Sequence, residues 1–164
     1  MMTSNISLHN KEISIEELLP KLKEFRSEGK TIGFTNGCFD ILHRGHIEYL
    51  HAAAELADIL IIGLNSDSSV RKLKGPARPV QDEQSRSLIL SSLFFVDFVI
   101  LFSEETPHRL ISSIEPDVLI KGGDYKPEEI VGYDIVTRKG GRVVTIPFIE
   151  GYSSSSIIRK LDEN

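Results

Sequence analysis

Two histidines separated by a short, glycine-containing stretch are the residues of this chain whose types and spacing best suit chemistry. His43 and His46 are three positions apart, with Gly45 between them. An apolar stretch and an Asn36-Gly37 turn signal precede them, and apolar residues recur at helical spacing from Gly45 onward. The histidines should therefore lie where a helix begins, at free N–H groups and the positive end of the helix dipole. We interpret the segment as a phosphate site with imidazole cations, in which Gly45 allows close approach to the backbone.

A metal centre is the alternative interpretation of the same segment. Cys38, Asp40, His43 and His46 are all residue types that bind transition metals. Their spacing, however, resembles no common zinc ligand set. We therefore favour the anion site and expect no metal bound directly by protein side chains.

Composition limits the class of protein. The chain has 164 residues, of which 40% are hydrophobic, and this suits one core better than two. A net charge of −5 gives no basic footprint for nucleic acid, and a single cysteine excludes an intrachain disulfide. No apolar run is long enough to span a membrane, and no signal pattern opens the chain. We expect a cytoplasmic protein with small-molecule partners, and neither a nucleic-acid nor a membrane partner.

Strand and helix patterns alternate along the chain after a polar N-terminus, 1–13, that we expect to be flexible. The patterns predict strands over 31–35, 59–64, 98–101, 118–120 and 142–146. They predict a helix from Ile15 that ends at Gly29, and further helices over 45–57, 81–92, 107–114, 133–139 and 154–161. Continuous apolar strands such as 59–62 are typical of parallel sheets that are covered on both faces. The predicted fold is α/β, a Rossmann-like, doubly wound, parallel five-stranded sheet in a single domain over 14–164.

Segments that follow the predicted strands should meet at one edge of the sheet, because ligands bind outside the carboxyl ends of parallel strands. The segment 65–79 is predicted to be a cationic loop that carries Arg71, Lys72, Lys74 and Arg78. The segments 121–129 and 150–158 contribute a glycine pair and a run of serines. Neither a Walker sequence nor a G-x-G-x-x-G fingerprint is present.

His43-Arg44-Gly45-His46, preceded by Asn36-Gly37-Cys38-Phe39-Asp40, resembles the HxGH motif and nucleotide-binding turn of the nucleotidyltransferase superfamily. The resemblance extends from about Lys30 to Leu161 and is greatest for the adenylyltransferases of ADP-heptose synthesis. It implies a nucleotidyltransferase domain over 14–164 that transfers AMP from ATP to D-glycero-β-D-manno-heptose 1-phosphate, releasing pyrophosphate. It also implies a homodimer and a sugar kinase, here in a separate protein, that acts in the same pathway.

The resemblance assigns roles to individual residues. His43, His46 and Lys74 would be catalytic, with Lys74 reaching the phosphates from a flexible loop that closes. Asp124 would lie near the ribose, the serines would hold the triphosphate, and Mg²⁺ would arrive on the nucleotide phosphates. The nucleotide-binding residues would be Thr35, Asn36, Gly37, Cys38, Phe39, Asp40, Gly45, Arg86, Lys121, Gly123, Asp124, Ser153, Ser154 and Ser155. Tyr152 and Ser155 depart from the small apolar residue and the threonine usual at these positions.

Two other functions stay open. A glycerol-3-phosphate cytidylyltransferase, or a related cytidylyltransferase, would use the same edge of the sheet with a different base and acceptor. A non-catalytic nucleotide-binding module would use it only for recognition. Pyrophosphate release from ATP or CTP with several phosphorylated acceptors distinguishes the three.

Overall fold

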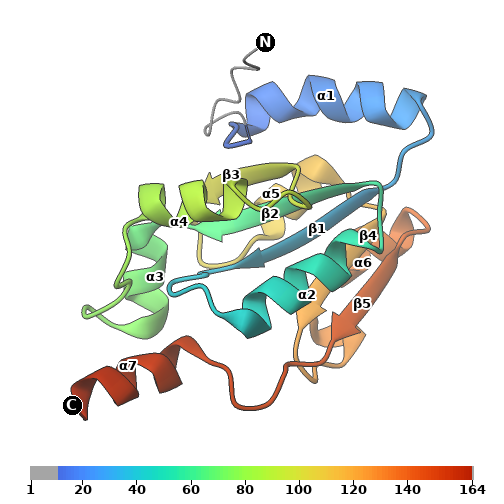
Figure 1. The fold of residues 1–164 in the computed structure, drawn as a ribbon. Helices are drawn as coiled ribbons and strands as arrows, with labels where there is room; N and C mark the ends of the chain where they lie inside the picture. The colour runs from blue at the N-terminus through green and yellow to red at the C-terminus, as the bar shows by residue number, and fades with distance from the viewer. Residues whose placement is uncertain (1–10, 164) are drawn as a thin grey trace, which may run out of the picture.

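The computed structural model describes residues 11–163 as an α/β fold with one five-stranded sheet (Figure 1). All neighbouring strands are parallel, in the order β3-β2-β1-β4-β5. The strands are β1 (Ile32–Gly37), β2 (Ile59–Asn65), β3 (Phe98–Phe102), β4 (Val118–Gly122) and β5 (Arg142–Ile146). The predicted fold class is confirmed, and every predicted strand is present with its ends shifted by two residues or fewer.

Helices cover both faces of the sheet, because alternate strand residues point to opposite sides. On one face Ile59 and Ile61 pack with α1 (Ile15–Ser27), α5 (His108–Ile114) and α6 (Tyr133–Arg138). On the other face Leu60 and Ile62 pack with α2 (Arg44–Ala54) and α4 (Glu83–Ser91). The continuous apolar run at 59–62 is therefore explained, since both sides of β2 are buried.

The segment predicted to be a cationic loop is mostly a helix, α3 (Asp67–Lys74), and this part of the prediction is wrong. Ser66 caps its first turn by accepting a hydrogen bond from the Ser69 N–H, and Gly75 ends it with φ 95°. Only Ser69 and Val70 of this helix are buried, so no apolar stripe reveals it in the sequence. A short 3₁₀ turn, η1 (Pro127–Glu129), was also not predicted.

The segment predicted to be a flexible N-terminus, 1–13, is only partly within the described residues. Residues 1–10 lie outside the described residues. Residues 11–13 lie against the edge of the sheet, where the Val99 N–H donates to the Lys11 carbonyl and the Ile13 N–H donates to the Val99 carbonyl. The described part of this segment is therefore hydrogen-bonded to the sheet.

The strand order creates a switch point between β1 and β4. From β1 the chain adds β2 and β3 on one side, and it then crosses over to add β4 and β5 on the other. Connections that leave the carboxyl ends of β1 and β4 diverge, which opens a crevice at that edge. A long connection from β5 leads to α7 (Ser154–Asp162), which lies below α3 in Figure 1.

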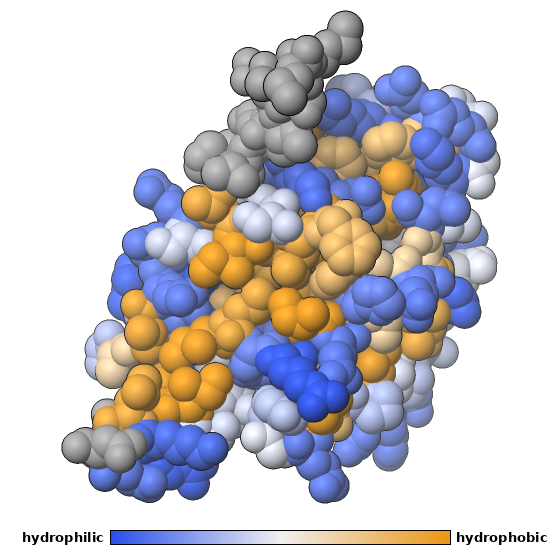
Figure 2. Space-filling view, viewed as in Figure 1, coloured by the Kyte–Doolittle hydropathy of each residue, from blue (hydrophilic) through white to orange (hydrophobic). Residues whose placement is uncertain are grey.

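Apolar side chains are also found at the surface of the molecule. Figure 2 shows an orange area at the lower left, where α7 lies, that continues toward the middle of this face. Leu161 of α7 is 71% exposed. Among the described helices, none combines the length and the apolar character that a membrane span requires.

Candidate active site

The two histidines lie side by side at the amino end of α2. His43 is the N-cap residue, and its Nδ1 accepts a hydrogen bond from the His46 N–H over 3.3 Å. The two imidazole rings stack with their centroids 3.8 Å apart and an angle of 18° between their planes. Because Nδ1 of His43 accepts a hydrogen bond, the neutral ring carries its proton on Nε2, where it can donate to a ligand.

Both imidazoles are neutral in the ligand-free protein at neutral pH. Burial, followed by the charges of His43 and Lys74, lowers the pKa of His46 to about 4. Burial also lowers the pKa of His43. Without a ligand the pair therefore offers directed N–H donors. The expectation of histidine cations beside a bound phosphate stays a prediction, since the anion would raise both pKa values.

The turn between β1 and α2 has a constrained backbone. Phe39 has φ 44°, in the left-handed region that non-glycine residues rarely occupy, and its ring packs edge-on against His46. A side chain at Gly37 would place its Cβ 2.9 Å from the Phe39 ring. Gly37 therefore leaves the space that the Phe39 ring fills beneath the histidines.

Cys38 lies in this turn, half-buried, with a free thiol. Burial raises the pKa of the Cys38 thiol. A raised pKa keeps sulfur protonated at neutral pH, so Cys38 is poorly suited to act as a nucleophile.

A cavity of about 690 Å³ opens at the switch point, a size typical of small-ligand sites. It brings together most of the residues that the sequence predicted for the site. These are Asn36, Gly37, Cys38, Phe39, Asp40, His43, Gly45, His46, Lys74, Lys121, Ser153, Ser154 and Ser155. Residues from β1, α2, α3, β4 and α7 thus surround one space, as the strand-end rule predicted.

Two lysines supply positive charge around this cavity. Lys74, at the end of α3, is exposed and close enough to the histidines for its charge to lower the pKa of His46. Lys121 comes from β4 and donates to the Asn36 side-chain oxygen over 3.4 Å. Burial lowers the pKa of Lys121. The cavity therefore combines two ammonium groups with neutral imidazole donors.

The serines place the start of α7 at the same cavity. Ser153 is its N-cap and forms a capping box with Ser156. The Ser154 hydroxyl donates to the Ile41 carbonyl over 3.1 Å, which ties α7 to the turn before the histidines. Tyr152, just before α7, makes a second contact with the start of α2: the Arg44 guanidinium lies 5.7 Å from the centre of the Tyr152 ring, as in a cation–π interaction. The amino ends of two helices, α2 and α7, thus meet at one cavity, and helix amino ends favour anions.

Comparison with known proteins identifies the family. A family profile described as cytidylyltransferase-like matches residues 34–160. The chain belongs to the cytidylyltransferase-like family. The match runs from β1 into α7 and so includes the whole cavity.

Relatives of this cytidylyltransferase-like chain include longer proteins. The chain is 53% identical over 150 residues to the bifunctional protein HldE of Rhodopseudomonas palustris strain ATCC BAA-98 / CGA009, covering 92% of this chain and 31% of the relative. It is 49% identical over 160 residues to the bifunctional protein HldE of Trichlorobacter lovleyi, and this match covers 98% of this chain and 32% of the relative. The chain therefore spans about a third of the length of these relatives.

A solved structure is similar in both sequence and fold. The lipopolysaccharide core biosynthesis protein of Thermoplasma volcanium GSS1 superposes with a TM-score of 0.62 and 31% identity. The superposition covers 76% of this chain and all of the other. It agrees with the Rossmann-like arrangement of the cytidylyltransferase-like chain.

Four of the predicted site residues of this cytidylyltransferase-like domain do not line the cavity: Thr35, Arg86, Gly123 and Asp124. The Thr35 hydroxyl is buried and shares a 2.6 Å hydrogen bond with the Tyr49 hydroxyl. Asp124 is exposed to solvent. Their contacts with a nucleotide stay predictions.

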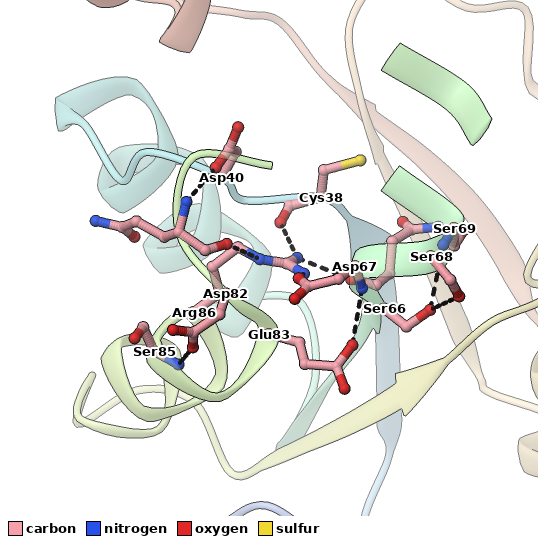
Figure 3. Close-up of polar contacts among 12 residues, drawn as sticks. Cys38, Asp40, Ser66, Asp67, Ser68, Ser69, Asp82, Glu83, Ser85 and Arg86 are labelled. Carbon is pink, nitrogen blue, oxygen red and sulfur yellow. Dashed lines mark hydrogen bonds and ion pairs between the residues drawn. The ribbon is translucent and has the colours of Figure 1, made fainter. Parts of the chain in front are cut away.

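Arg86 lies on the predicted helix, here α4, but its guanidinium is buried and bonded to protein groups. It donates to the carbonyls of Cys38, Asn65 and Gln81 over 2.7, 2.8 and 3.0 Å. It also pairs with the Asp67 carboxylate at 2.7 Å. Figure 3 shows the guanidinium between Cys38 and Asp67. Arg86 thus joins the ends of β1 and β2 to the start of α3.

The alternative metal centre is not assembled. No group of three His, Cys, Asp or Glu side chains placed to hold a metal occurs among residues 11–163. The Asp40 carboxylate is enclosed, and it accepts hydrogen bonds from Arg78 and from the N–H groups of Val80 and Gln81. This carboxylate therefore cannot join the histidines as a ligand.

Sequence reasoning missed part of the cavity wall of the cytidylyltransferase-like domain. The missed residues are Tyr49, Glu105, Thr106, Pro107, Val131, Phe148 and Ile149, whereas Asn65, Leu73, Gly122, Tyr125 and Tyr152 lie in the predicted segments 65–79, 121–129 and 150–158 without being named as site residues. Glu105, Thr106 and Pro107 follow the carboxyl end of β3, and Phe148 and Ile149 follow that of β5. Applying the strand-end rule to these two strands as well would have found the segments, though not the individual residues.

Proposed function

We propose that this chain is a nucleotidyltransferase that transfers AMP from ATP to D-glycero-β-D-manno-heptose 1-phosphate, giving ADP-heptose and pyrophosphate. The observation that carries the proposal is the stacked His43–His46 pair at the start of α2, facing a cavity that Lys74 also lines. The similarity to HldE proteins and to a lipopolysaccharide core biosynthesis protein supports the choice of acceptor.

The reaction is an in-line displacement at phosphorus. A phosphate oxygen of the acceptor forms a bond to the α-phosphorus of ATP while the bond from that phosphorus to the bridging oxygen of pyrophosphate breaks. Such a step requires positioning and charge stabilisation more than a protein nucleophile. In this chain the Nε2–H of His43 and the ring of His46 would donate to the phosphate oxygens. Lys74 and the start of α7 would stabilise the charge that develops on the leaving group.

Mg²⁺ is part of the proposal through the nucleotide. The enclosed Asp40 carboxylate is used within the protein, and the cavity wall is otherwise rich in cations, amides and hydroxyls. This donor set fits a cation held mainly by phosphates and water. Besides Asp40, Glu105 brings a carboxylate to the described cavity wall. Bound in this way, Mg²⁺ would neutralise phosphate charge.

The proposal also includes the partners and the place of action. We propose that a separate sugar kinase of the same pathway makes the acceptor. We further propose that the enzyme is a homodimer that acts in the cytoplasm. Light scattering of the purified protein measures the subunit number.

A substrate panel tests the function. ATP and CTP are each paired with heptose 1-phosphate and with glycerol 3-phosphate, and pyrophosphate release is measured. We expect release with ATP and the heptose phosphate. Release mainly with CTP would support a cytidylyltransferase instead, and nucleotide binding without release from any acceptor would support a non-catalytic module.

A histidine variant tests the mechanism. His46→Ala removes one of the paired donors and should lower kcat at least 100-fold, since positioned proton and charge donors contribute about 10²–10⁴-fold. His51→Ala is the matched control, because His51 is on the same helix, exposed and outside the cavity. Normal turnover by folded His46→Ala would contradict the mechanism.

A further inference from the structure

The helix that carries Lys74 is fastened at both ends. At its start, the Asp67 carboxylate pairs with Arg86, and the Asp67 N–H donates to the Glu83 carboxylate over 2.8 Å. At its end, Gly75 leads into a turn in which the Arg78 N–H donates to the Gly75 carbonyl over 3.1 Å. This turn joins the end of the helix to the segment that follows, so a contact that holds this segment also restrains the end that carries Lys74.

Asp40 holds that segment. One oxygen of its carboxylate pairs with the Arg78 guanidinium. The other accepts from the N–H groups of Val80 and Gln81 over 2.8 and 3.1 Å. The Asp40 side chain has no exposed surface, whereas the Arg78 side chain is 14% exposed. These contacts use the carboxylate within the protein, so it is not available to touch a nucleotide.

The charge state of Asp40 agrees with this arrangement. Burial by itself would raise the pKa of Asp40, but hydrogen bonds from the Gln81 N–H, Arg78 and the Val80 N–H outweigh burial and lower that pKa. The carboxylate is therefore ionised at neutral pH, which gives the charge-assisted hydrogen bonds that hold best.

We propose that Asp40 is a positioning residue: its carboxylate fastens residues 78–81 to the turn after β1 and so holds Lys74 at the cavity wall beside the paired histidines. In this arrangement Lys74 is in place before the nucleotide binds and does not arrive on a closing loop. The kinetic part of this inference rests on the proposed nucleotidyl transfer, while the structural part does not.

Asp40→Asn tests the inference, since it keeps the shape of the side chain and removes its charge. An amide offers one oxygen and turns an N–H₂ toward either Arg78 or the backbone donors. We expect hydrogen exchange at the Val80 and Gln81 N–H groups to become at least tenfold faster in the ligand-free protein. We also expect kcat to fall at least tenfold while the Kd for ATP changes less than threefold.

Two further variants make the test specific. Arg78→Gln removes only the charged contact at a partly exposed position and should change exchange and kcat in the same direction by a smaller factor. Asp117→Asn is the matched control, because Asp117 also joins a backbone N–H, that of Ile32, to a cation, Lys139, away from the cavity. It should leave exchange at residues 78–81 and kcat within twofold of the parent protein.

The outcomes separate the inference from the proposed function. Unchanged exchange at Val80 and Gln81 in folded Asp40→Asn would overturn the anchoring role. A tenfold weaker ATP affinity with unchanged exchange would show direct nucleotide contact and would also overturn it. If the parent protein released no pyrophosphate with any acceptor, the proposed function would fail, while the exchange measurements would still decide whether Asp40 anchors this segment.

Discussion

Replacing Arg86 by methionine should destabilise the fold by about 3 kcal/mol. The Arg86 side chain is fully buried, and its guanidinium serves three carbonyl oxygens and one carboxylate. Breaking a buried ion pair by removing one partner costs roughly 3–5 kcal/mol, because the remaining charge is left uncompensated. The Asp67 side chain is 23% exposed, so water can reach it, and methionine recovers some of the packing. Both effects place the expected loss at the lower end of this range.

Urea unfolding followed by circular dichroism measures this change, with the same m-value required for both proteins. For a chain of this length the loss corresponds to a melting temperature lower by roughly 6–12 °C. Arg138→Met is the control, because its pair with Asp134 is exposed on the surface of α6 and should contribute about 0.5 kcal/mol or less. A loss below about 1 kcal/mol for Arg86→Met would refute the view that this guanidinium holds the strand ends together.

Two further predictions concern groups in and beside the cavity. In the ligand-free protein, NMR should show the His46 imidazole titrating near pH 4. Because this folded-state pKa lies below the usual 6.5, the free energy of unfolding should fall as the pH drops from about 6.5 toward 4. Titration near pH 6.5 would contradict the burial described for this ring. Thr35→Val should cost about 1–2 kcal/mol by leaving the buried Tyr49 hydroxyl without its partner, whereas Thr35→Val combined with Tyr49→Phe should restore much of this stability. ATP affinity should stay within threefold in Thr35→Val, and a larger loss would show that Thr35 contacts the nucleotide.

The fold was predictable because its signals are local and strong. Buried parallel strands appear as continuous apolar runs such as 59–62, and helices such as α1 show an apolar stripe. The helix α3 was missed for the opposite reason. Its residues are almost all polar, and its stability comes from a serine cap and from contacts with α4 that no local pattern reveals.

The candidate site was predictable to the level of segments. Turn residues and strand ends located the histidines, Lys74 and the serines, which the structure brings to one cavity. The orientation of single side chains was not predictable. Arg86 and Asp40 have the residue types of ligand contacts, and only the three-dimensional structure shows that their charges are used by backbone groups distant in sequence.

The cavity wall is divided between two kinds of chain segment. The groups proposed to assist the transfer come from α2, α3 and the start of α7, whereas Glu105, Thr106 and Pro107 follow β3, and Tyr125 and Val131 follow β4. These latter connections contribute to the wall without carrying the paired imidazoles or Lys74. The sequence of these connections can therefore change, and with it the shape of the cavity, without altering the groups that are proposed to act on the phosphates.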